Sequence, residues 1–152
     1  MSIVGNLDIH TADGGIMNIN DLQVGTEVYC LEPLAPLPEG VSNNGEAESI
    51  SSIERTTAAE DQFGWKLEND APAETTGFSL TLTPDQLVWC VSDNEYKTAS
   101  SFVSGDTVYV WENNIETVTY SAEQQIFNQP ITNIKTSGTH NSILAQGVLL
   151  KA

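Results

Sequence analysis

Basic residues are scarce in this chain. Of its 152 residues, 5 are Lys or Arg and 21 are Asp or Glu, so the formal net charge is −16. Nucleic acids and anionic membranes are bound by basic surfaces, and this composition therefore excludes both as expected partners. The charge suits a cationic partner or a salty medium, and it is equally what an ordinary acidic, soluble surface carries.

Long apolar runs and closely spaced cysteines are also missing. No stretch approaches the roughly 18 apolar residues of a membrane helix. The N-terminus lacks a basic segment followed by an apolar run, so we expect no signal peptide and synthesis in the cytoplasm. The two cysteines, Cys30 and Cys90, lie in apolar contexts and are predicted to be buried free thiols, with a disulfide as the alternative.

Recognisable ligand-binding motifs are absent as well. The sequence has no cysteine and histidine spacing for zinc, no calcium-binding loop and no glycine-rich phosphate loop. We therefore expect no metal, no cofactor and no small-molecule substrate.

Short runs in which β-branched or aromatic residues alternate with polar ones make up most of the chain. This pattern predicts an all-β fold, and the length predicts one domain over residues 1–152. Loop insertions are expected near 32–47, which is rich in Pro and Gly, and near 58–76, which is acidic. These loops are either plain surface insertions or the surface that meets a partner. The predicted strands are Leu7–Thr11, Ile16–Ile19, Glu27–Leu31, Ile50–Thr56, Gly64–Leu67, Ser79–Thr83, Leu87–Val91, Tyr96–Thr98, Thr107–Trp111, Thr117–Tyr120, Ile131–Lys135, Ser142–Ala145 and Val148–Leu150.

An internal repeat recurs at an offset of 80 residues. The stretch from Thr11 to Tyr29 matches that from Val91 to Tyr109 without a gap, including the turn residues, a glycine and a closing Val-Tyr. Each copy predicts a β-hairpin, a short irregular segment and a strand that follows the glycine. The fold is therefore expected to contain two related β units.

Four segments resemble the sequence blocks of the Hint family, which comprises inteins, hedgehog autoprocessing domains and intein-like domains of bacteria and phages. In chain order they are the stretch from Ser2 to Gly25, that from Leu82 to Trp89, the strand Ile131–Thr136 and the stretch from Thr139 to Leu150. The resemblance implies an all-β horseshoe of two β-hairpin units related by a pseudo-two-fold axis. The internal repeat agrees with that symmetry.

The resemblance also implies where autoprocessing chemistry would lie. Ser2 matches the nucleophile that attacks the preceding carbonyl, Thr83 the residue that orients the scissile amide, and His140 a family histidine. Ser2 is equally explained as an ordinary second residue, and His140 as a hydrogen-bonded residue at a strand end.

Four positions depart from the family pattern. They are Gln86 in place of a proton-supplying histidine, Asn133 in place of an aspartate, and Lys151 and Ala152 in place of a terminal His-Asn pair. Glutamine cannot shuttle a proton near neutral pH, and losing such a group typically costs on the order of 10²–10⁴ in rate. Alanine has no side-chain amide to cyclise, so release of a downstream flank by that route is excluded.

These departures favour a non-enzymatic role. We expect a Hint-like protein with a degenerate site that self-assembles or binds protein partners, with a virion, as in a phage particle, as one setting. The alternative is a mini-intein or intein-like autoprocessing domain in an inactivated form. A third hypothesis, an unrelated β-sandwich such as a decoration or carbohydrate-binding module, would lack the horseshoe.

Overall fold

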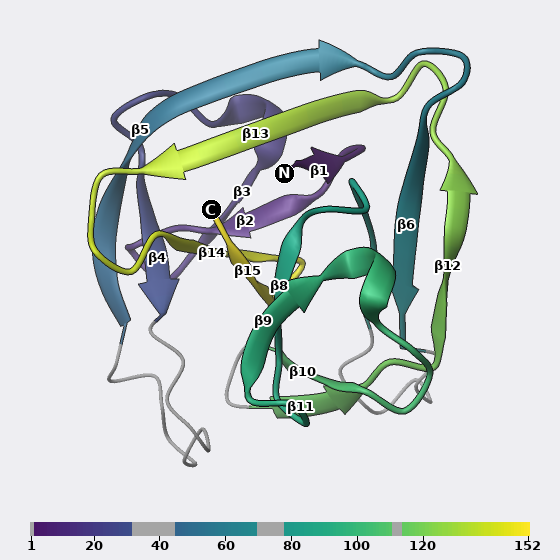
Figure 1. Cartoon of the computed structure of the whole chain (residues 1–152). Coiled ribbons are helices and arrows are strands. Elements are labelled where there is room, and N and C mark those ends of the chain that lie inside the picture. Colours follow the sequence, from purple (N-terminus) through teal and green to yellow (C-terminus); the bar gives the residue numbers. More distant parts are fainter. Residues whose placement is uncertain (1, 32–44, 70–77, 111–113) are drawn as a thin grey trace.

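The computed structural model describes residues 2–31, 45–69, 78–110 and 114–152, which form two curled antiparallel β-sheets (Figure 1). The first sheet has the strand order β12-β6-β7-β1-β13-β5-β4. Its strands are β12 (Tyr120–Gln125), β6 (Phe63–Glu68), β7 (Ser79–Leu82), β1 (Ile3–Val4), β13 (Pro130–Thr136), β5 (Gly45–Thr57) and β4 (Glu27–Leu31).

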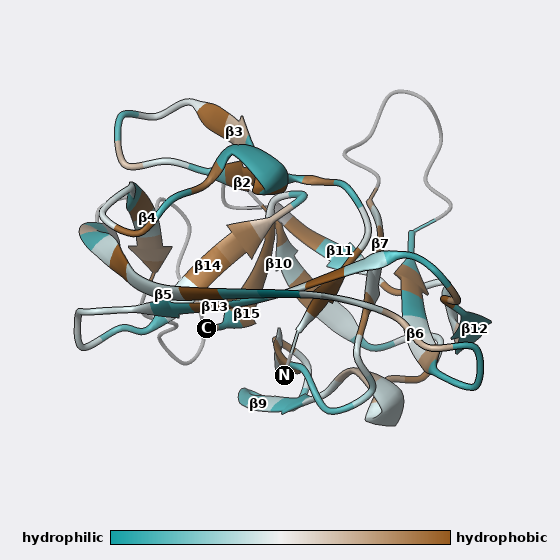
Figure 2. Ribbon diagram, turned by 90° about the horizontal axis from the view of Figure 1, so that it is seen from above, coloured by the Kyte–Doolittle hydropathy of each residue, from teal (hydrophilic) through white to brown (hydrophobic). Residues whose placement is uncertain are grey.

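The second sheet has the order β11-β10-β8-β15-β14-β2-β3, and β9 adds a further partner to β8. Its strands are β11 (Asn114–Thr117), β10 (Thr107–Val110), β8 (Leu87–Cys90), β15 (Val148–Lys151), β14 (Ser142–Ala145), β2 (Asp8–His10), β3 (Ile16–Asn18) and β9 (Glu95–Thr98). The N-terminal mark lies beside β1 and the C-terminal mark at the end of β15 (Figure 1), and the two marks lie near one another in both views (Figures 1 and 2).

The internal repeat is visible in three dimensions. Two short 3-10 helices of the described residues, η1 (Ile19–Asp21) and η3 (Ala99–Ser101), start 80 residues apart. In both copies the repeated glycine has a positive φ and its N–H donates a 2.9 Å hydrogen bond to a carbonyl, from Gly25 to Ile50 and from Gly105 to Val118. The expected pair of related β units is therefore confirmed.

The two copies differ by one residue in their hairpin turns, which corrects the expectation of a match without a gap. His10 pairs with Ile16 in the first hairpin, whereas Trp89 pairs with Tyr96 in the second. The second turn is therefore one residue longer. Gly14 and Asn94 take the positive φ values of +89° and +55° that let these turns close.

The hairpin of β14 and β15 forms the centre of the core. Alternate side chains of these strands enter two hydrophobic clusters, Val148 and Leu150 on one face and Leu144 and Leu149 on the other. All four side chains are buried. The brown colour of β14 in Figure 2 shows that most of its residues are hydrophobic. A strand that is covered on both faces reads as a continuous apolar run, which is why the sequence Val148–Leu150 does not alternate.

Several boundaries differ from the predicted ones. Gly45–Ala47, placed in the loop near 32–47, are the first residues of β5 because they pair with the end of β4. The strand predicted at Thr117–Tyr120 is wrong, since the chain there crosses between the sheets. The Val118 N–H donates to the carbonyl of Asp106, which directly precedes β10 of the second sheet. The Thr119 N–H donates to the carbonyl of Glu68 at the end of β6 in the first sheet.

Other expectations are settled by burial. Cys30 and Cys90 are both buried and free, so the thiol prediction is confirmed and the disulfide alternative is wrong.

Residues 32–44, 70–77 and Trp111 lie outside the described residues. Within the described part, no helix is long and apolar enough to cross a membrane.

Candidate functional site

Ser2 and Thr83 meet where β1 lies beside β7. The Ser2 N–H donates a 2.8 Å hydrogen bond to Thr83 Oγ1, and the Thr83 N–H donates a 2.9 Å bond to the Ser2 carbonyl. The Ser2 nitrogen belongs to the peptide bond that a Ser2 nucleophile would attack. The Thr83 hydroxyl therefore contacts the amide that an acyl shift would release.

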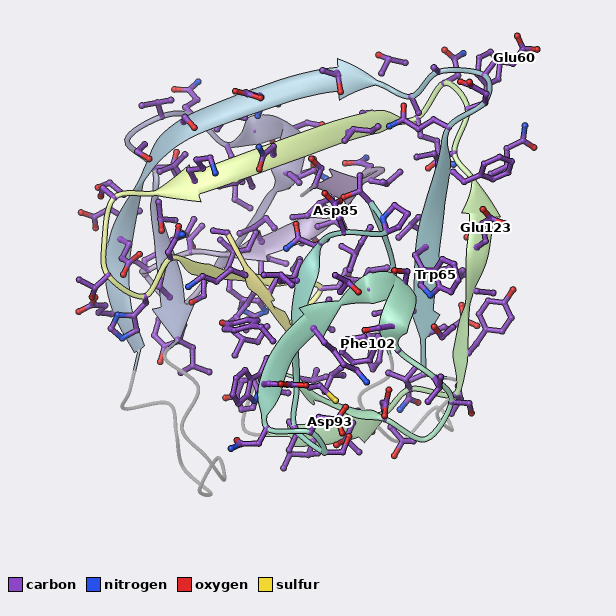
Figure 3. The ribbon with its side chains drawn as sticks, in the orientation of Figure 1. Glu60, Trp65, Asp85, Asp93, Phe102 and Glu123 are labelled. Carbon is purple, nitrogen blue, oxygen red and sulfur yellow. The ribbon has the colours of Figure 1, made fainter. Side chains whose placement is uncertain are left out.

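The Thr83 hydroxyl also contacts two acceptors. It lies 3.2 Å from the Ser2 carbonyl oxygen, and a hydrogen bond from it lowers the pKa of Asp85 below its usual value. Asp85 is exposed in the turn between β7 and β8, close to β1 (Figure 3). Its carboxylate is ionised at neutral pH, so Asp85 holds no proton to give to a leaving nitrogen.

Gln86 joins the beginning of β8 to the end of β15. Its side chain is 3% exposed, and its Nε2 donates to the carbonyl of Lys151 at 2.6 Å and to that of Leu87 at 3.0 Å. Both hydrogens of the amide are therefore bound to backbone carbonyls. Such a group holds two strands together, and an uncharged amide is too weak an acid to give up a proton near neutral pH.

The last two residues of the chain are fixed by the backbone. The Ala152 N–H donates a 2.8 Å hydrogen bond to the carbonyl of Asn141, and Ala152 is buried. The Lys151 ammonium lies 3.4 Å from the carbonyl of His140 and 5.5 Å from the centre of the Tyr96 ring. The register of β15 on β8, with Leu150 opposite Val88, continues to place Ala152 opposite Gln86.

Asn133 lies on the other side of Ser2. β13 pairs with β1 so that Thr132 is opposite Ile3, and one further step along the ladder puts Asn133 opposite Ser2. Hydrogen bonds and strand register together bring six of the candidate positions to one place. They are Ser2, Thr83, Gln86, Lys151, Ala152 and Asn133.

The His140 ring is turned to a different set of groups. Its Nδ1 lies 2.8 Å from Glu46 Oε1 and 3.5 Å from Glu48 Oε2, both on β5. The backbone of His140 reaches the site through its carbonyl contact with Lys151. This placement agrees with a hydrogen-bonded residue before a strand, which was the alternative explanation of His140.

Glu48 is a buried carboxylate beside His140 whose contacts the sequence did not reveal. Its carboxylate accepts hydrogen bonds from the Thr136 hydroxyl at 2.8 Å and from the N–H groups of His140 and Asn141 at 2.9 and 3.1 Å. Burial acts to raise the pKa of Glu48, but these hydrogen bonds outweigh it and lower the pKa. The available signal was its position two residues before buried Ile50, which puts both on the inner face of β5.

The overall structure is similar to solved inteins and intein-like domains. A bacterial intein-like domain from Clostridium thermocellum matches with a TM-score of 0.73 and 16% identity, covering 99% of this chain and 98% of that chain. The gp41-1 intein matches with a TM-score of 0.70 and 14% identity over 100% and 99%. A DnaB intein from Synechocystis sp. PCC 6803 matches with 0.73 and 13% over 99% and 97%.

These likenesses show that the chain has the Hint fold of inteins, and the expected horseshoe is confirmed. The third hypothesis, an unrelated β-sandwich, is therefore wrong. No known protein-family profile matches the sequence, and no curated protein sequence matches it. At such low identities the fold is shared, and the chemistry has to be argued from the site.

Proposed function

We propose that this protein is an intein-like domain whose peptide-bond chemistry is lost and whose fold works as a structural or binding component of a protein assembly, such as a phage particle. The observation that carries the proposal is Gln86, whose two amide hydrogens are both bound to backbone carbonyls. The position that would have to move a proton instead clamps β8 to β15.

The surroundings of Gln86 support the same proposal. Release of a flank after position 152 would need a side-chain amide there to attack its own carbonyl carbon, and Ala152 offers only a methyl group. Formation of an ester at Ser2 would break the preceding C–N bond, and the departing nitrogen would need a proton. Thr83 accepts a hydrogen bond from that nitrogen, and Asp85 is ionised, so neither supplies it.

The charge supports an assembly role with a basic partner. A formal net charge of −16 on 152 residues opposes close packing of identical copies and favours a cationic surface. Identical copies of this chain would assemble only if a basic partner covered their acidic faces.

The test restores the missing groups in stages, with a folded flanking domain on each side of residues 2–152. Ala152→Asn alone, Ala152→Asn with Lys151→His, and these two with Gln86→His are compared with the unaltered sequence by intact mass. We expect cleavage after position 152 only when all three changes are present. Cleavage of the unaltered sequence would overturn the proposal. A triple variant that stays inert while its fold is intact by circular dichroism would show that the residues at positions 86, 151 and 152 are not what silences the site.

A further inference from the structure

The first copy of the repeat contains an open cavity of about 270 Å³ beside its hairpin turn. The cavity lies between the β2–β3 turn and the start of β4. It is lined by Thr11, Ala12, Asp13, Met17, Thr26 and Glu27. A volume just under the usual 300–1,000 Å³ of small-molecule pockets is right for a single side chain.

The corresponding place in the second copy is occupied by a lysine of the chain itself. The Lys97 ammonium lies 2.9 Å from Asp93 Oδ2 and 2.7 Å from Asp106 Oδ2, and 4.8 Å from the centre of the Phe102 ring. Asp93 and Phe102, which flank the β9 and η3 segment, are labelled in Figure 3. The second copy thus holds one half-buried ammonium between two carboxylates.

Two hydrogen bonds establish that the places correspond. In the second copy the Val103 N–H donates a 2.9 Å bond to Asp106 Oδ2, and in the first the Gln23 N–H donates a 3.1 Å bond to Thr26 Oγ1. Thr26 therefore takes the place of Asp106, 80 residues on. At the same offset Met17 takes the place of Lys97, so the first copy lacks its internal ammonium.

The first copy nevertheless keeps anionic groups around the cavity. Hydrogen bonds from the Thr11 hydroxyl and the Gly15 N–H lower the pKa of Asp13, and the Glu27 side chain is exposed at the rim. Most basic side chains of the chain are bound elsewhere. Arg55 donates to two carbonyls near η1, Lys66 pairs with Glu68, and Lys151 contacts His140.

We propose that this cavity accepts the ammonium group of a lysine side chain from a basic protein partner, which takes the position that Lys97 occupies in the second copy. Asp13 and Glu27 attract the charge, Thr11 and Thr26 offer hydroxyl oxygens, and Met17 covers the aliphatic part of the lysine. The high negative charge of the chain steers such a partner toward it. The inference uses the proposed function only in taking the occupant to be part of a protein.

The test is an NMR titration of the ¹⁵N-labelled full chain with Nα-acetyl-lysine methylamide, with the norleucine analogue as the uncharged control. We expect saturable shifts at Ala12, Asp13, Thr26 and Glu27 with the lysine compound and none with the norleucine compound. Equal shifts with both, or shifts spread over the acidic surface, would overturn the ammonium site.

Met17→Lys supplies the decisive variant, because it gives the first copy its own ammonium. We expect Met17→Lys to weaken binding of the lysine compound at least about tenfold, while the matched Met17→Leu leaves it within about twofold. Unchanged binding by a folded Met17→Lys protein would contradict the proposal. An n-butylamine titration that matches a lysine-containing peptide in affinity would show that the site takes free amines, which overturns the protein partner.

Loss of the cavity site and loss of the proposed function give different results. The titration measures binding in the cavity beside the β2–β3 turn, and it involves none of Ser2, Thr83 or Gln86. The staged restoration reads cleavage at the chain ends and involves none of the cavity residues. A failure of either experiment therefore leaves the other interpretable.

Discussion

Gln86 Nε2 lies 2.6 Å from the carbonyl oxygen of Lys151, so the side chain that replaces a proton-carrying histidine is bonded to the strand that ends in Ala152. The contact joins residues 65 positions apart and is almost completely shielded from water. A shielded hydrogen bond is costly to break when one partner is left without a substitute. The site therefore contributes to holding β8 and β15 of the second sheet in register.

Gln86→Leu tests this structural role. The substitution keeps the approximate volume but leaves the carbonyls of Leu87 and Lys151 without their donor, and we expect a loss of about 1–3 kcal/mol in the free energy of unfolding. Urea unfolding at pH 7 measures it. Gln125→Leu, on the exposed end of β12, is the matched control and is expected to stay within about 0.5 kcal/mol. Equal effects of the two changes would show that Gln86 is not a clamp.

Glu48 makes stability depend on pH. Because the folded-state pKa of Glu48 is lowered below its ordinary 4.5, its contribution is complete above pH 4.5 and is lost as the pH falls through the folded-state pKa. We expect Glu48→Gln to lower the free energy of unfolding by about 1–3 kcal/mol at pH 7. The gap between variant and parent should narrow below pH 4.5.

Denaturant unfolding from pH 7 down to pH 3 checks the Glu48 prediction. Glu54→Gln, an exposed residue of the same strand β5, is the control and should show a small gap at every pH. A gap for Glu48→Gln that stays constant across this range would mean that the carboxylate charge is not what holds the turn at His140.

Lys97→Met should destabilise the second copy of the repeat. Burial opposes the charge on Lys97, but hydrogen bonds to Asp106 and Asp93 outweigh it and raise the pKa of the lysine. Without Lys97, the Asp106 carboxylate, 14% exposed, loses its cationic partner and retains the hydrogen bond from the Val103 N–H. We expect a loss of about 1–3 kcal/mol, between the values for an exposed and for a buried ion pair.

Asp93→Asn is the comparison for that ion pair, because the Asp93 side chain is 45% exposed and bonds the same ammonium. It should cost no more than about 1 kcal/mol. Thermal or urea unfolding of both variants measures the two losses in the free energy of unfolding. A larger loss for Asp93→Asn than for Lys97→Met would contradict the assignment of Asp106 as the main partner of Lys97.

Both thiols should resist labelling in the folded protein. Cys30 and Cys90 are fully buried, and burial together with the nearby Glu48 carboxylate raises the pKa of Cys30 to about 12. Thiolate is the reactive form, so we expect no reaction with a disulfide reagent at pH 8 in buffer and two reacted thiols per chain in guanidinium. One rapidly reacting thiol in buffer would contradict the described burial.

Local sequence patterns predict many of the strands of the fold. The strands Glu27–Leu31 and Ser142–Ala145 have the predicted bounds, because each is a compact run of strand-forming residues between clear turn signals. The helical turn η1 lies in the short irregular segment that the repeat predicts between the hairpin and the strand after the glycine. The repeat contained the information for η3, since its position follows from η1 at the same offset of 80 residues.

Long-range pairing explains what the sequence did not show. The two-residue strand β1 is too short to have a period, and it exists because β7 and β13 lie on its two sides. The partners of His140 are likewise remote, since Glu48 lies 92 positions away. The meeting of Ser2, Gln86 and Lys151 was accessible only through the resemblance, because no local pattern links the two ends of a chain.

The central claim is that this fold does not cut its own peptide bonds. The most direct measurement is the intact mass of the unaltered sequence with folded domains attached before Ser2 and after Ala152, followed for several days at pH 7 with a Ser2→Ala control. The account predicts one unchanged mass in both proteins. A mass loss equal to either flank, and above all an upstream loss that Ser2→Ala abolishes, would contradict it.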